Sequence, residues 1–184
     1  MSGPYAPCTS RACRSLLLLA LVTAATVSCN TRRKADPEAA PAAPSAVARS
    51  SAKPQLTRRT NPPAPLEQFV QQHVEEGDVS GTRVLVYVGA TWCEPCKRFH
   101  EALESGELDS VLAGTKFIEF DADRDRAELR AAGYASKYIP LFSVPDPAGR
   151  ASGRAIEGSI KGDQAIREDL VPRLIALLDG KPTE

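Results

Sequence analysis

The sequence predicts an α/β domain in which helices flank a central mixed β-sheet. From Leu66 to the end of the chain, short apolar runs alternate with segments whose apolar residues recur at helical spacing. Alternating strands and helices favour a layered sheet, and a turn-rich hairpin late in the chain adds antiparallel strands. The segment 66–184 is long enough for a single hydrophobic core.

The first half of this segment predicts two helices and two strands. Residues 66–76 place apolar side chains on one helical stripe, and Gly77 is expected to end that helix. The run 83–88 is short and rich in valine, which is typical of a buried strand. A second helix is expected at 94–104 and a second strand at 116–120.

The second half continues the alternation and then changes to a hairpin. The expected elements are a short helical piece at 108–112, a helix at 124–131, strands at 141–144 and 153–157, and an amphipathic helix at 163–178. The turn signal Pro145-Asp146-Pro147-Ala148-Gly149 separates the last two strands, so the final strand is expected to be an antiparallel edge.

The first 29 residues resemble an export signal. Arg11 and Arg14 precede an apolar run at 16–27, which is too short to span a membrane comfortably. The run ends at Ser28-Cys29, which resembles the lipobox of bacterial lipoproteins, a family in which the cysteine is lipidated and becomes the mature N-terminus. We therefore expect residues 1–29 to be a signal peptide ending at a lipidated Cys29, and an ordinary cleaved signal is the alternative.

Residues 30–65 are predicted to be a disordered basic linker. They are rich in Ala, Pro, Ser, Thr and Arg and have no hydrophobic period, so they cannot bury enough apolar surface to offset the entropy of ordering. They carry seven Lys or Arg against two Asp or Glu, whereas residues 66–184 carry 14 against 21. The acidic domain argues against nucleic acid as a partner.

Cys93 and Cys96 carry the chemistry that the sequence indicates most strongly. They lie three positions apart, after the expected strand and at the start of the helix 94–104. The unpaired N–H groups and the positive end of the dipole at a helix N-terminus both favour a thiolate over a thiol. A thiolate at Cys93 would attack a disulfide, and Cys96 would then displace Cys93 from the mixed disulfide. The other three cysteines all precede Asn30, so an exported form would hold one pair.

The string Trp92-Cys93-Glu94-Pro95-Cys96-Lys97 after one strand, and Tyr138-Ile139-Pro140-Leu141 before another, resemble the thioredoxin family. The resemblance covers roughly 66–181 and implies a thioredoxin-like fold. It implies that Cys93 is the exposed attacking thiolate and that Cys96 is the more buried resolving thiol.

The resemblance also implies roles for four residues around the dithiol. Trp92 would shield the two thiols and shape the docking surface for a client protein. Pro140 would be a cis-proline that faces the pair, and the backbone of Ile139 would hydrogen-bond to an extended client strand. Gly158, between the hairpin and the last helix, would lie beside the same groove.

Two positions depart from the thioredoxin pattern. Thioredoxins carry a buried Asp six residues before the nucleophile, where it assists proton transfer to the resolving thiol. This chain has Tyr87 there, and a tyrosine is a poor base near neutral pH. Glu119 on the next strand would serve as the proton relay if its side chain points inward. Glu94 replaces a Gly, and a carboxylate beside Cys93 opposes thiolate formation although it suits a helix N-terminus.

Two less reactive roles for the cysteine pair carry less weight. Zinc would need further ligands. The chain has no second cysteine pair to supply them, and the remaining candidates are His73 and His100. A purely structural disulfide would close so short a loop that it would restrict the unfolded chain little. We therefore expect neither a metal nor another cofactor.

Taken together, the sequence predicts a membrane-tethered thiol–disulfide oxidoreductase outside the cytoplasm, facing the periplasm, and more specifically a reductase of protein disulfides. Its partners would be disulfide- or thiol-containing envelope proteins, a membrane electron donor or acceptor, and the membrane through the lipid on Cys29. The main alternative is a non-catalytic thioredoxin-like binding module at the envelope. A reductase for the haem-attachment cysteines of cytochrome c is a third hypothesis that no residue favours.

Overall fold

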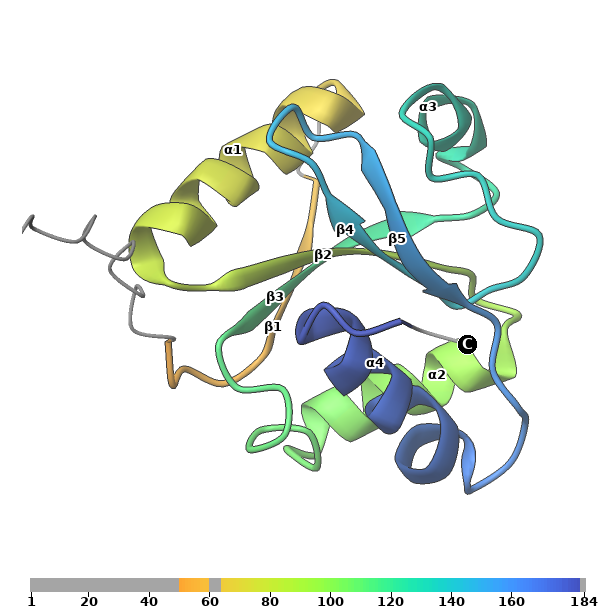
Figure 1. Ribbon diagram of the computed structural model, residues 1–184. Coiled ribbons are helices and arrows are strands. Elements are labelled where there is room, and N and C mark those ends of the chain that lie inside the picture. The colour runs from red at the N-terminus through yellow and green to blue at the C-terminus, as the bar shows by residue number, and fades with distance from the viewer. Residues whose placement is uncertain (1–49, 60–63, 183–184) are drawn as a thin grey trace, which may run out of the picture. The chain divides into compact units, whose positions relative to one another are not determined.

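The computed structural model describes residues 50–59 and 64–182, which build a five-stranded mixed sheet (Figure 1). The strands are β1 (Gln55–Arg58), β2 (Arg83–Gly89), β3 (Thr115–Asp121), β4 (Leu141–Pro145) and β5 (Ala151–Glu157). Their order across the sheet is β1-β3-β2-β4-β5. The first three in this order run parallel, and β4 and β5 are antiparallel to their neighbours.

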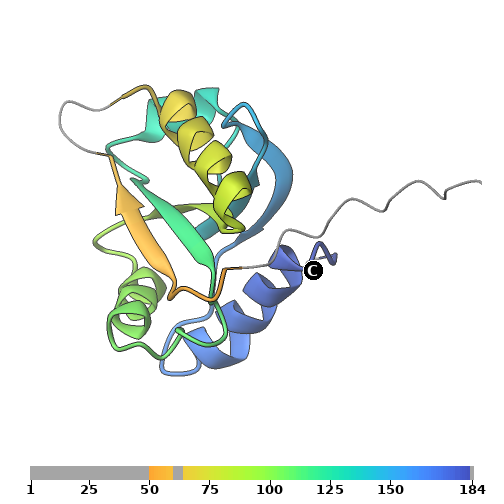
Figure 2. The ribbon, with the colours of Figure 1, turned by 90° about the vertical axis from the view of Figure 1, so that its left-hand side faces the viewer.

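Helices cover both faces of this sheet (Figures 1 and 2). They are α1 (Leu66–Ser80) and α3 (Arg126–Ala131) on one face, and α2 (Glu94–Glu104), the π-helix η1 (Ala165–Leu170) and α4 (Val171–Leu178) on the other. Alternate residues of β2 enter the two cores: Leu85 and Tyr87 face α2 and α4, while Val86 and Val88 face α1. Burial on both faces explains why β2 is an almost unbroken apolar run. The expected α/β class, a central mixed sheet flanked by helices, is confirmed.

The domain begins earlier than the sequence suggested, because the expected linker 30–65 contains β1. Residues 55–58 pair in parallel with β3, from Gln55 opposite Lys116 to Arg58 opposite Glu119. The prediction of disorder was wrong here because backbone pairing to a strand 60 residues later, rather than a local apolar pattern, holds this segment. The expected leader with Cys29, and the rest of the linker except 50–54, 59, 64 and 65, lie outside the described residues.

The first helix and the segment 108–112 also differ from the prediction. The first helix continues to Ser80, because Gly77 serves close packing: a Cβ there would lie 2.7 Å from the Thr82 carbonyl oxygen. Gly81, at φ 69°, ends the helix instead. Residues 108–112 form hydrogen-bonded turns and no helix.

The terminal helix changes type along its length. It begins as the π-helix η1 and becomes α-helical at Val171. Pro172 follows, and a proline lacks the N–H that an α-helix would bond to the fourth residue back. In the part of the chain that the structure describes, no helix combines the length and apolar character needed to cross a bilayer.

Candidate functional site

A disulfide joins Cys93 and Cys96 where β2 passes into α2. The S–S distance is 2.07 Å and the two Cα atoms lie 5.2 Å apart. Cys93 is the N-cap of α2, and its Sγ accepts a hydrogen bond from the backbone N–H of Cys96 at 3.3 Å. Pro95 occupies the first turn, where its missing N–H costs no helical hydrogen bond. The expected strand-to-helix junction is therefore confirmed, and the helix N-terminus is positioned to stabilise negative charge on Cys93.

Both cysteines are buried in this disulfide form. Cys93 is 4% exposed and Cys96 is 3% exposed, so the expectation of an exposed Cys93 is wrong for the structure described. The reason is that both sulfurs belong to the apolar cluster that packs α2, η1 and α4 against the sheet.

Trp92, which precedes Cys93 in the sequence, is far more exposed than the disulfide itself. Trp92 is 64% exposed, and its Nε1 donates a hydrogen bond to Asp123 Oδ2 at 2.8 Å. Tyr138 is 55% exposed and Ile160 is 48% exposed. Exposed aromatic side chains of this size are typical of contact surfaces for another polypeptide.

Pro140 lies at the same edge of the sheet as the dithiol. The Ile139–Pro140 bond is cis, as the resemblance implied. Leu141, the next residue, pairs with Val88 near the end of β2, which leads directly to Trp92 and Cys93. Ile139 is half-buried and packs against both core clusters.

Gly158 lies beside Pro140, as the sequence suggested. Its backbone N–H donates to the Pro140 carbonyl oxygen at 2.9 Å. Its φ is 67°, and an added Cβ would come within 3.2 Å of Tyr138 Cβ. A side chain at Gly158 would therefore strain the backbone and push against Tyr138.

Glu94 opposes a thiolate at Cys93 less than its charge alone suggests. Its carboxylate forms a short ion pair with Arg98, and Arg98 also contacts Asp163 at 2.7 Å. The hydrogen bond from Arg98 is the main reason that the pKa of Glu94 lies below its usual value. The carboxylate is thus directed toward a cation one turn along α2.

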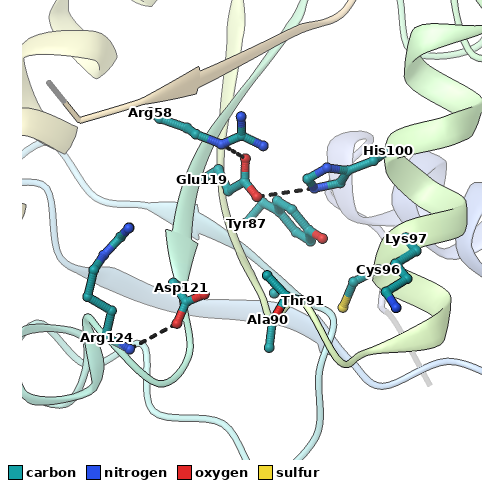
Figure 3. Close-up of a pocket in the computed structure, with 11 residues that line it drawn as sticks. Arg58, Tyr87, Ala90, Thr91, Cys96, Lys97, His100, Glu119, Asp121 and Arg124 are labelled. Carbon is teal, nitrogen blue, oxygen red and sulfur yellow. Dashed lines mark hydrogen bonds and ion pairs between the residues drawn. The ribbon is translucent and has the colours of Figure 1, made fainter.

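Cys96 also borders a cavity of about 400 Å³ (Figure 3). The cavity has charged residues around a partly apolar floor, unlike the exposed surface near Trp92. Its lining residues are Arg58, Tyr87, Gly89, Ala90, Thr91, Cys96, Lys97, His100, Glu119, Asp121 and Arg124.

Glu119 points into this cavity, which satisfies the condition that the sequence left open. Phe117, two positions earlier on β3, enters the core beneath α2, and alternation puts Glu119 on the same face. One carboxylate oxygen lies 3.1 Å from His100 Nε2, and the other forms an ion pair with Arg58. Burial alone would raise the pKa of Glu119, but the contacts with His100 and Arg58 outweigh it and keep the pKa below its usual value.

Tyr87 is the other buried polar residue of the cavity. Its ring is stacked on Phe142 at 5.0 Å between centroids and lies 5.1 Å from Phe99. The side chain is 0% exposed, and burial is the main reason that its pKa is raised, with the Glu119 charge adding to the effect. Tyr87 therefore keeps its proton throughout the neutral range, in accord with the expectation that it is a poor base.

Two residues of the cavity were missed by the sequence analysis. From the sequence, His100 was interpreted as a surface residue of the helix rather than as a zinc ligand, yet its position one helical turn after Cys96 could have placed it beside the dithiol. Arg58 gave no signal because it lay in the expected linker. Within the two described ranges, no three His, Cys, Asp or Glu side chains gather in a way that would hold a metal ion.

Comparison with known proteins finds similarity to redox proteins. Nucleoredoxin from Bos taurus is 32% identical over 81 residues, which are 44% of this chain and 18% of nucleoredoxin, so the chain spans under a fifth of that relative. A mutant thioredoxin from Halobacterium salinarum is 19% identical with a TM-score of 0.39, over 73% of this chain and 95% of its own. A poplar thioredoxin h is 21% identical with a TM-score of 0.41, over 69% and 97%. No family model matches the chain.

Proposed function

We propose that this chain is a thiol–disulfide oxidoreductase that reduces disulfides in client proteins. The observation that carries the proposal is the Cys93–Cys96 disulfide at the N-cap of α2, adjacent in sequence to the exposed Trp92 and on the sheet edge that holds cis-Pro140. The helix N-terminus would stabilise the attacking thiolate of Cys93. Trp92 and Tyr138 would provide the surface on which a client docks.

The proposed reaction is an exchange of two electrons and two protons. In the reduced chain, the Cys93 thiolate attacks one sulfur of a client disulfide, and the second client sulfur leaves as a thiolate. Cys96 then attacks Cys93, which releases the first client sulfur and forms the Cys93–Cys96 disulfide. A membrane electron donor would return the disulfide to the dithiol.

Insulin reduction with dithiothreitol as the electron donor tests this proposal. The purified chain should precipitate reduced insulin clearly faster than its Cys93→Ser variant. A Val79→Ser variant changes a side chain that is 88% exposed on α1, across the sheet from α2, and should match the unmodified chain. Equal rates for the unmodified chain and Cys93→Ser would overturn the proposal.

The burial of Cys93 favours a second candidate, a binding module whose dithiol takes no part in turnover. Trapping separates the two candidates. In a Cys96→Ala variant, the reductase should accumulate mixed disulfides between Cys93 and envelope proteins. A binding module would instead capture the same clients without covalent linkage, whether or not either cysteine is present.

We also propose that the domain works outside the cytoplasm on a lipid tether. The support is the leader sequence and Ser28-Cys29, which resemble a lipoprotein signal. Mass spectrometry of the mature N-terminus should find an acylated Cys29. An unmodified N-terminus at another residue would contradict the tether and leave the proposed reductase activity untouched.

A further inference from the structure

The buried hydroxyl of Tyr87 has no role in the site as described above. Among residues 50–59 and 64–182, nothing forms a hydrogen bond with it. Leaving a hydroxyl buried without a partner costs free energy, and a role in redox chemistry is one reason for a native fold to retain such a group. Removing only this oxygen would leave the packing of the ring on Phe142 and Phe99 intact.

The missing partner is suggested by the space beside Gly89. A Cβ added at Gly89 would lie 2.5 Å from the Tyr87 hydroxyl oxygen and 3.4 Å from Cys96 Sγ. The hydroxyl and the sulfur therefore border the same small gap, which stays open because residue 89 has no side chain. Figure 3 shows the hydroxyl end of Tyr87 directed toward the helix that carries Cys96.

We propose that the Tyr87 hydroxyl donates a hydrogen bond to the Cys96 sulfur when the disulfide opens, and so stabilises the thiolate of the resolving cysteine. The inference rests on the proposed thiol–disulfide exchange and assigns a residue to its second step. A sulfur in a disulfide is a weak acceptor, whereas a thiolate forms a stronger, charge-assisted hydrogen bond. The hydroxyl would thus lack a partner in the oxidised state and gain one in the reduced state.

In the resolving step, Cys96 must lose its proton before its sulfur attacks Cys93. The new Cys93–Cys96 bond forms while the bond from Cys93 to the client breaks, and its electron pair leaves with the client sulfur as a thiolate. Tyr87 keeps its own proton and lowers the pKa of Cys96 by hydrogen bonding. The Cys96 proton passes through the cavity to solvent, with the Glu119 carboxylate as the acceptor on the way.

Acidic and basic groups both surround Cys96, so no single ion pair can supply the hydrogen bond that we assign to Tyr87. The titratable or charged groups that line the cavity are Glu119 and Asp121, Arg58 and Arg124, and Lys97 and His100 on the helix of Cys96 itself. Glu119 is already engaged by Arg58 and His100. The neutral hydroxyl is the donor that faces the gap at Gly89.

Tyr134 provides a matched control. It is also buried, at 2% exposure, but its hydroxyl donates to the Gly149 carbonyl oxygen at 3.0 Å. Gly149 lies in the turn between β4 and β5, and Tyr134 belongs to the core cluster on the opposite face of the sheet from Cys96. Removal of either hydroxyl is the same chemical change, but only the one at Tyr87 should alter the cysteine.

The test is an NMR titration of ¹³C-labelled cysteine in a Cys93→Ala chain, where Cys96 is a free thiol. Adding Tyr87→Phe should raise the pKa of Cys96 by about one unit, a tenfold loss of acidity, as expected for one hydrogen bond to a charged acceptor. Adding Tyr134→Phe should leave the pKa of Cys96 unchanged. Equal pKa values with and without Tyr87→Phe would overturn the inference.

A second measurement uses the intact dithiol. Because the hydrogen bond stabilises the Cys96 thiolate, Tyr87→Phe should shift the equilibrium with glutathione about tenfold toward the disulfide at a pH above the pKa of Cys96, which is about 30 mV for two electrons. A shift of the same size for Tyr134→Phe would overturn the assignment to Tyr87. Both measurements are made at equilibrium without a client, so a failed insulin assay would remove the proposed function and still leave the role of Tyr87 decided.

Discussion

Arg59 is expected to hold the first strand of the sheet in place. The guanidinium side chain is only 8% exposed and lies 2.8 Å from both Asp125 Oδ1 and Glu128 Oε2. It also lies over the Phe120 ring, 5.2 Å from the centroid. Arg59 follows β1 directly, so these contacts fasten the end of β1 to the start of α3.

Replacing Arg59 with alanine should cost a substantial part of the stability of the domain. Breaking a buried ion pair costs about 3–5 kcal/mol when the remaining charge has no other partner. Asp125 is 5% exposed but keeps Arg124 at 3.0 Å and the backbone N–H of Asp121 at 2.9 Å. Glu128 is 46% exposed and keeps a hydrogen bond from the backbone N–H of Leu66 at 3.0 Å. We therefore expect a loss of about 2–3 kcal/mol for Arg59→Ala.

Urea unfolding followed by circular dichroism measures this loss. With a slope of about 2 kcal/mol per molar urea, the midpoint should fall by about 1 M or more. The matched control is Lys53→Ala, which removes an ion pair with Asp109 from a side chain that is 80% exposed. That change should cost about 0.5 kcal/mol or less. Midpoints that fall equally in the two variants would refute the assigned role of Arg59.

Two further predictions concern packing and pH. Gly89→Ala should destabilise the domain by about 1–3 kcal/mol in urea, because its Cβ would lie 2.9 Å from Cζ of the rigid Tyr87 ring, and an unchanged midpoint would contradict this packing. A hydrogen bond with His73, and a weaker one from Lys116, lower the pKa of Glu76 to about 2. Because the folded-state pKa is below the usual 4.5, Glu76 adds stability above that pH and loses it as the pH falls toward 2. The carboxylate is half-exposed, so the contribution is under about 1 kcal/mol. Thermal melts of Glu76→Gln should differ from the unmodified chain at pH 7 and converge near pH 2, and a constant difference would be evidence against this pKa.

The junction of β2 and α2 could be predicted from the sequence because its signals are local. A valine-rich run, a cysteine at the N-cap and a proline in the first turn each act within a few residues. The helix was predicted at 94–104, and it spans Glu94–Glu104 in the structure. The strand was predicted at 83–88 and extends one residue further, to Gly89.

The strand β1 could not be predicted in the same way, because its four residues have no alternating pattern and its order comes from distant partners. Leu56 is its one large apolar residue, and it packs only partly against the core. Parallel pairing with β3, together with the ion pairs of Arg58 and Arg59, supplies the rest. Each of these contacts joins segments about 60 residues apart, so none is visible in a window of local sequence.

The face of β3 that carries Glu119 also depends on pairing between distant segments of the chain. The sequence placed Glu119 in the strand 116–120, where apolar residues fall on both faces, so either face could have been the one beneath the dithiol. The register of the sheet decides which face carries Glu119. Glu119 pairs with Tyr87 on β2, and both side chains line the cavity beside Cys96. A strand shifted by one residue would have reversed this arrangement.

The pairing of Tyr87 with Glu119 explains why a carboxylate at residue 87 would not suit this sheet. Residues opposite each other on adjacent strands have Cβ atoms about 5 Å apart, and two buried carboxylates at that distance oppose each other's ionisation. Glu119 is kept ionised by Arg58 and His100, so an Asp at the position of Tyr87 would take up a proton or would weaken those contacts. A neutral hydroxyl avoids the conflict. The proposed donor role of Tyr87 and the predicted relay role of Glu119 would then belong to paired residues on two adjacent strands.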